Sequence, residues 1–214
     1  MLDIALIEKC ADPSLTPAIV EQFVEAAGSR DPLAVTVKSG GRLILVPKPK
    51  TPVEALEIVR ENAGQAVVRV GLTQFPAGVG VKDVSELKAD LVDSCENLRM
   101  GTTMFAKVMR IVAKWYGNPT NKDVLPYIFD DAVYSWRTGE FEGVEVFQAE
   151  DPVKGWAIPK TTVAVQDDGD QRSIASETRP EEQHDDVAED EHPHEAGAEK
   201  AGMRIDMSRV GGQK

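Results

Sequence analysis

Apolar residues recur at helical spacing in several segments of the chain. Residues 17–27 carry a stripe of large apolar side chains every three or four positions, which predicts a helix. Thr16 stands at the N-cap position, Pro17 occupies the first turn, where a missing N–H costs little, and Gly28 ends the segment. The pattern therefore predicts both ends of this helix as well as its buried face.

Three further helices follow from the same reasoning. Thr51-Pro52-Val53-Glu54 is a capping-box sequence and predicts a helix that runs to about Gly64. Residues 98–116 carry the longest helical stripe of the chain, and residues 130–137 form a shorter helical pattern before Thr138-Gly139. We expect the long helix to provide much of the core, with its basic stripe on a solvated face.

Two short apolar runs, residues 33–37 and 43–46, flank a glycine turn at residues 38–42 and predict a β-hairpin. Residues 66–70 form a third run of this type. The segment at 143–147 is expected to pack loosely or to begin a linker. The fold class predicted is mainly α with a small β-hairpin or sheet, that is, α+β.

Charge divides the chain into two parts. The net charge is −12, but residues 166–214 contain 14 acidic and six basic side chains, so that segment carries −8 and residues 1–165 carry −4. Every aromatic residue lies before Ala157. A segment that is acidic and lacks aromatic residues cannot bury enough apolar surface to offset its ordering entropy. We expect a folded domain over 1–150, a linker or docking segment over 151–165, and a disordered acidic tail over 166–214.

Composition also excludes several function classes. An acidic chain does not suit general nucleic-acid binding, which needs basic side chains against phosphates. No run of uncharged apolar residues is long enough to span a bilayer. His192 and His194 lie among carboxylates in the tail, but their spacing is too loose to predict a metal site, and no cofactor is expected.

Seven short motifs occur along residues 10–147 in a recognisable order. They are Cys10-Ala-Asp-Pro, Asp31-Pro-Leu-Ala-Val, Gly40-Gly-Arg-Leu with Glu54-Ala-Leu, Val70-Gly-Leu-Thr-Gln-Phe, Asp93-Ser-Cys-Glu-Asn-Leu, and Thr138-Gly-Glu-Phe-Glu-Gly. In this order they resemble the lytic-transglycosylase-like component of type IV secretion systems, and in particular conjugal transfer proteins of Ti-type and rhizobial plasmids. The resemblance implies a lysozyme-like fold over about two thirds of the chain.

In the family that the chain resembles, one glutamate at the end of the first main helix acts as both acid and base in glycan cleavage. The matching position here is Ala27, or Ala26 if one residue is inserted, and neither side chain transfers a proton. Glu25 is the nearest substitute, but two residues along a helix rotate a side chain by roughly 200°, away from the family direction. The resemblance therefore predicts a transglycosylase-like domain that lacks its catalytic residue.

Three other positions correspond to the glycan cleft of the family. Gln74 matches a glutamine that contacts the glycan, although it can equally satisfy loop backbone, and Thr73 beside it offers a hydroxyl. Trp136 stands where the family has a tyrosine, so an indole that donates but does not accept replaces a phenol. We take Gln74, Thr73 and Trp136 as candidate substrate-binding residues.

The resemblance also pairs Cys10 with Cys95, since the secretion-system branch carries cysteines at both positions. A disulfide there implies an oxidising compartment, the periplasm. The first residues lack a basic segment before the apolar run, so no standard secretory signal is visible, and this argues for the alternative of a cytoplasmic protein with two buried thiols. Of the two compartments, we expect the periplasm.

Together these observations favour an accessory protein of plasmid conjugal transfer that binds peptidoglycan or components of the type IV secretion apparatus without cleaving glycan. Two alternatives remain at this point. One is an active lytic transglycosylase that opens the cell wall with a recruited carboxylate such as Glu25. The other is a cytoplasmic interaction protein that acts through its acidic tail.

Overall fold

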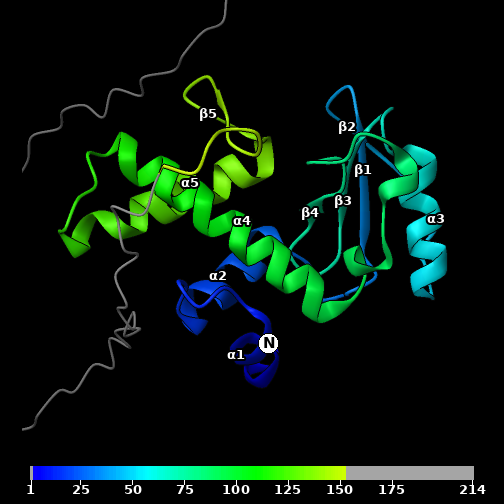
Figure 1. Ribbon diagram of the computed structural model, residues 1–214, viewed down its shortest axis with the longest axis horizontal. Helices are drawn as coiled ribbons and strands as arrows, with labels where there is room; N and C mark the ends of the chain where they lie inside the picture. Colours follow the sequence, from blue (N-terminus) through cyan, green and yellow to red (C-terminus); the bar gives the residue numbers. More distant parts are fainter. Residues whose placement is uncertain (1, 153–214) are drawn as a thin grey trace, which may run out of the picture. The chain divides into compact units, whose positions relative to one another are not determined.

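A computed structural model describes residues 2–152 of the chain (Figure 1). These residues belong to the first of the two units into which the chain divides, residues 1–166. The predicted tail over 166–214, its three histidines and nearly all of the predicted linker lie outside the described residues.

The described part combines five α-helices with antiparallel strands. The helices are α1 (Ile4–Cys10), α2 (Pro17–Ala27), α3 (Pro52–Asn62), α4 (Ser94–Trp115) and α5 (Leu125–Thr138). The strands are β1 (Val35–Ser39), β2 (Arg42–Ile44), β3 (Val67–Val70), β4 (Phe75–Pro76), β5 (Glu140–Phe141) and β6 (Val144–Glu145). The predicted α+β class is confirmed.

Capping residues explain where the helices begin. The Thr16 and Thr51 hydroxyls each accept a hydrogen bond from the backbone three residues on, as predicted for α2 and α3. Helix α4 begins four residues earlier than predicted because the Asp93 carboxylate accepts from the N–H groups of Cys95 and Glu96. Helix α5 also begins early, with Pro126 in its first turn.

The first four strands form one sheet in the order β2-β1-β3-β4. The predicted β1–β2 hairpin is present, and β3 pairs with β1 on its other side. Val37 and Val68 are opposite each other in the register and both are buried. Helix α3 packs against β1 and β3, and Figure 1 shows it beside this sheet. One sheet face is therefore part of the core, which leaves the other face free to contribute to a cleft.

Aromatic rings join three helices at the centre of the domain. Phe23 of α2 stacks on Phe105 of α4 with ring centroids 3.9 Å apart, and Trp136 of α5 meets Phe23 edge to face at 5.1 Å. All three side chains are fully buried. These contacts fix the C-terminal ends of α2 and α5 relative to each other.

Two segments differ from the expectations. Helix α1 was not predicted, although Asp3 caps it and Ile7 packs into the core. The prediction of loose packing at residues 143–147 is wrong, because Val146 is fully buried and the Phe147 ring lies 5.3 Å from that of Trp136. No helix within residues 2–152 is long and apolar enough to cross a membrane.

Candidate binding cleft

A cleft of about 360 Å³ lies where the ends of α2 and α5 approach the sheet. Its walls come from the end of α2, from β1 and β3, from the loop after β3, and from the end of α5. The residues that line it are Ala26, Ala27, Gly28, Thr36, Lys38, Arg69, Gln74 and Arg137. It thus includes Ala26 and Ala27, the two positions that the sequence resemblance matches to the family's glutamate.

The end of α2 offers this cleft no carboxyl group. Ala26 and Ala27 form the last turn, and Gly28 follows them with its Cα close to the Leu72 backbone, since a Cβ there would stand 2.2 Å from the Leu72 oxygen. Glu25 is exposed to solvent and is not one of the residues that line the cleft. The structure therefore does not bring Glu25 to the matching position.

Strand alternation places polar side chains on the cleft side of the sheet. Thr36 and Lys38 are two residues apart on β1, so they share a face, and Arg69 on β3 is the register partner of Thr36. The intervening Val37 belongs to the opposite, buried face. The same alternation that builds the core therefore supplies two cations to the cleft.

Arg69 is a buried cation with only 8% of its surface exposed. Its guanidinium donates to the Trp136 oxygen at 2.6 Å, the Arg137 oxygen at 3.2 Å and the Gln74 oxygen at 3.3 Å, and it lies 5.6 Å from the centre of the Phe147 ring. Burial lowers its pKa to about 10, so it is still charged at neutral pH. Because a helix C-terminus carries partial negative charge, this position at the end of α5 suits a cation.

Arg137 is exposed at the last turn of α5, on the other side of the cleft. Its Nη2 donates to the Ala26 oxygen and so links the end of α5 to the end of α2. The two helix ends that form the cleft are thus connected by both buried rings and a surface hydrogen bond.

Gln74 lines the cleft with its backbone in the left-handed region, at φ 50°. Its side-chain nitrogen donates to the Gly71 oxygen at 3.1 Å and to the Ala34 oxygen at 3.4 Å. The amide nitrogen therefore satisfies loop backbone, which is the second of the two alternatives that the sequence left open. A contact between Gln74 and a sugar stays a prediction.

Thr73 and Trp136 are fully buried, so neither lines the cleft in this structure. The Trp136 indole donates to the Thr73 oxygen at 3.0 Å, and the Thr73 hydroxyl donates to the Asn97 side-chain oxygen at 2.9 Å. Asn97 in turn donates to the Val70 and Leu91 oxygens. Both side chains therefore hold the loop beneath the cleft in this structure, and a contact of either with substrate stays a prediction.

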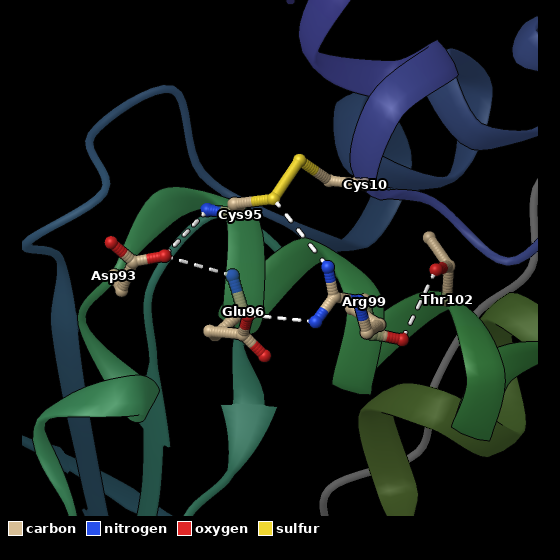
Figure 2. A network of polar contacts seen from close by, with 6 residues as sticks. All are labelled: Cys10, Asp93, Cys95, Glu96, Arg99 and Thr102. Carbon is tan, nitrogen blue, oxygen red and sulfur yellow. Dashed lines mark hydrogen bonds and ion pairs between the residues drawn. A yellow bond between two sulfur atoms is a disulfide. The ribbon is translucent and has the colours of Figure 1, made fainter.

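Cys10 and Cys95 form a disulfide between the end of α1 and the start of α4 (Figure 2). Near it, the Arg99 guanidinium donates to the Glu96 carboxylate at 2.7 Å. The Thr102 hydroxyl accepts from the Asp12 N–H at 2.8 Å and so fixes the chain just after α1. The N-terminal segment is therefore attached to α4 by covalent and polar contacts.

A second hollow, of about 610 Å³, lies between the end of α4, the end of α5 and the β5–β6 hairpin. We call it the aromatic groove. Its side chains include Trp115, Tyr134, Asp131, Glu140 and Glu142, and the two aromatic residues are 60% and 62% exposed. Tyr116 donates to the Asp131 carboxylate at 2.8 Å, and this raises the Tyr116 pKa above its usual value.

Comparison with known protein families finds a match along nearly the whole chain. The TraH_2 family model matches residues 1–212. The chain belongs to the TraH_2 family. A relative of this TraH_2 chain, the uncharacterized protein y4dP of Sinorhizobium fredii (strain NBRC 101917 / NGR234), is 61% identical over 212 residues, which cover 99% of this chain and 100% of the relative. No solved structure matches. Family membership associates the protein with conjugal transfer.

Two residues that shape the cleft of this TraH_2 protein were missed from the sequence. Arg69 stands in a valine-rich strand, where the alternation Val-Arg-Val signals one polar face. Asn97 lies inside the predicted Asp93-to-Leu98 motif, but only the fold brings it beneath the loop of Thr73. Within the described residues no cluster of His, Cys, Asp or Glu is arranged to hold a metal ion.

Proposed function

We propose that this TraH_2 protein is a non-catalytic component of the conjugal transfer apparatus that binds peptidoglycan glycan strands in the cleft at the ends of α2 and α5. The observation that supports the proposal is the cleft itself, which is lined by Ala26 and Ala27, the two positions that the resemblance matches to the catalytic glutamate. Binding needs shape and polar contacts, whereas cleavage needs a positioned acid.

The proposal includes a lysozyme-like ancestry of the domain and a type IV secretion context. It also includes a periplasmic location, where peptidoglycan is accessible. The disulfide of Cys10 and Cys95 supports that location, because disulfides persist in oxidising compartments. Cell fractionation combined with thiol labelling tests it: the periplasmic fraction is expected to hold the protein with both cysteines blocked. Recovery in the cytoplasm with two free thiols would exclude this location.

The main experiment is co-sedimentation of the purified full-length protein with isolated sacculi, followed by assay of the supernatant for anhydro-muropeptides. We expect the protein to pellet and no anhydro-muropeptide to be released. If the unchanged protein releases anhydro-muropeptides and Glu25→Gln does not, the protein is the active lytic transglycosylase of the alternative hypothesis.

A matched pair of variants tests whether the cleft is the binding site. Ala27→Trp places an indole in the cleft, while Gln22→Trp places the same group on an exposed position of the same helix. We expect the first to lose sedimentation and the second to retain it. Equal sedimentation of both would exclude the cleft, and no sedimentation of the unchanged protein would exclude glycan binding.

A further inference from the structure

The aromatic groove shares no lining residue with the cleft and has no part in the proposed glycan binding. Four of its side chains are aromatic: Trp115, Tyr116, Tyr134 and Phe141. Trp115 and Tyr134 are exposed, although large aromatic side chains bury much of their surface in most folded proteins. Exposed apolar surface gathered in a hollow is typical of a site that contacts another molecule.

The exposed rings continue beyond the groove along α5. Tyr127, Asp131, Tyr134 and Thr138 are four, three and four positions apart, so they lie on one face of the helix. Tyr127, like Tyr134, is exposed. The surface is thus a groove of about 610 Å³ with an aromatic stripe that leads from it. An elongated partner such as a peptide segment can contact both, whereas a small molecule fills only the groove.

All charged side chains that line the groove are acidic. They are Asp131, Glu140 and Glu142, and no lysine or arginine lines the groove beside them. None of the ion pairs found in residues 2–152 involves these three carboxylates. A cation that arrives from a partner therefore meets negative charge that no cation of the described chain neutralises, and this complementarity favours a basic partner.

The β5–β6 hairpin concentrates this negative charge at a cost to its own pairing. Glu140 and Glu145 are register partners, so two acidic residues stand opposite each other on neighbouring strands. Glu142 adds a third in the turn, with its backbone in the left-handed region at φ 48°. Like charges that face each other across a hairpin destabilise it, and a bound cation reduces their repulsion. The charge pattern therefore suits binding of a cation better than it suits the hairpin alone.

We infer that the aromatic groove binds an arginine-bearing segment of a partner protein. A guanidinium stacks on aromatic rings and donates two parallel N–H groups to a carboxylate, whereas a lysine ammonium is more strongly hydrated. Trp115 and Tyr134 supply exposed rings, and Glu140 and Glu142 supply carboxylates next to them. The inference goes beyond the proposed function, since it assigns a protein partner to a second surface.

Three peptides of equal length, acetylated and amidated at their ends, test the inference by isothermal titration calorimetry with the full-length protein. Each alternates glycine with one other residue, which is arginine, lysine or citrulline, the neutral analogue of arginine. We expect the arginine peptide to bind about tenfold more tightly than the citrulline peptide and about threefold more tightly than the lysine peptide. We also expect its affinity to fall as salt is raised.

Groove variants locate the binding site. Trp115→Ala removes an exposed ring, and Glu140→Gln combined with Glu142→Gln removes two carboxylates. Each variant is expected to weaken binding of the arginine peptide about tenfold. Glu57→Gln combined with Glu61→Gln is the matched control, since it changes the net charge equally at exposed positions of α3 outside the groove. We expect the control to change the affinity less than about twofold.

Several results would overturn the inference. Equal binding of the arginine and citrulline peptides would exclude recognition of a cation, and equal binding of the lysine peptide would exclude arginine as its source. Equal weakening by the groove pair and the α3 pair would show attraction to the net charge of the chain instead of the groove. Self-association of the unchanged protein that is lost in Trp115→Ala would assign the groove to a second copy of this chain. Sedimentation with sacculi, measured on the same variants, tests glycan binding separately.

Discussion

The cleft and the aromatic groove are both formed at the C-terminal end of α5, yet they are built in opposite ways. The cleft presents cations above a buried polar frame in which Arg69, Asn97 and Thr73 are each bonded to backbone or to one another. The groove presents exposed rings and carboxylates, and its lining side chains are joined by one hydrogen bond, Tyr116 to Asp131, and by edge-to-face contacts of Trp115 with Tyr116 and Phe141. We therefore expect the cleft to be preformed and the groove to be adjustable.

The two hollows also differ in local charge, which the net charge of the chain does not reveal. All charged residues that line the cleft are basic and all that line the groove are acidic, although both hollows belong to the same described unit. Ligand preference follows local charge rather than the total for the chain. The following substitutions test this contrast between the two hollows, from the largest expected effect to the smallest.

Arg69→Met is expected to cause the largest loss of stability. The substitution leaves the Trp136, Arg137 and Gln74 oxygens without their donor, and an unpaired buried polar group costs about 1–3 kcal/mol. We expect the free energy of unfolding to fall by about 3 kcal/mol in urea denaturation. Asp131→Asn in the groove is the control and should change it by less than about 1 kcal/mol. Equal stability of the two variants would mean that the buried polar frame of the cleft contributes no more to stability than an exposed residue of the groove.

Trp136→Phe is expected to cost about 2 kcal/mol, because it removes the hydrogen bond to the Thr73 oxygen and leaves a void in a fully buried site. Trp115→Phe makes the same chemical change at a residue of the groove that is 60% exposed, and we expect a change within about 0.5 kcal/mol. Thermal unfolding monitored by circular dichroism measures both. Similar melting temperatures for the two variants would contradict the description of a rigid cleft and an adjustable groove.

Tyr116 provides a pH test of the groove. The hydrogen bond to the Asp131 carboxylate favours the neutral phenol and raises the Tyr116 pKa. The stabilisation is therefore complete below the unfolded tyrosine pKa of about 10 and is lost as the pH rises through the higher folded value. Ultraviolet titration should show one late-titrating tyrosine in the native protein. Asp131→Asn should lower the Tyr116 pKa, and an unchanged titration curve would show that the bond is absent in solution.

Arg137→Gln is expected to have the smallest effect on stability, below about 1 kcal/mol. Arg137 is exposed, and only one hydrogen bond, to the Ala26 oxygen, depends on its side chain. Urea denaturation in parallel with Arg69→Met measures the difference. A loss as large as that of Arg69→Met would mean that Arg137 belongs to the buried polar frame.

Local signals in the sequence predicted the elements but not the assembly of the cleft. Thr16, Thr51 and the glycine turn at residues 38–42 act through neighbours in the chain, so α2, α3 and the β1–β2 hairpin could be placed from sequence. Helix α1 is only seven residues long and has too few turns to show a periodic pattern. The β5–β6 hairpin is stabilised by Val146 and Phe147 against distant residues, which no local pattern reveals.

The candidate site, like the fold, could be predicted from sequence only where the signal is local. The alanines at the end of α2 and Gln74 could be named from motif order, and all of them line the cleft. Thr73 and Trp136 occupy motif positions too, but the direction of a side chain depends on what packs around it, and both point into the interior. Arg69 was missed because a cation inside a strand gains its significance only when the end of α5 is placed against it.

The disulfide has a topological consequence for the cleft. Cys10 and Cys95 are 85 positions apart in the sequence, and their disulfide closes the chain between them into a covalent ring. Seven of the eight residues that line the cleft lie within that ring, and Arg137 lies outside it. A single proteolytic cut anywhere between the two cysteines therefore leaves one covalently continuous molecule that still carries both the α2 wall and the sheet wall. Only a cut beyond Cys95 can break the covalent connection to Arg137, so the ring keeps two walls covalently joined, whereas the third is joined to them covalently only through the chain after Cys95.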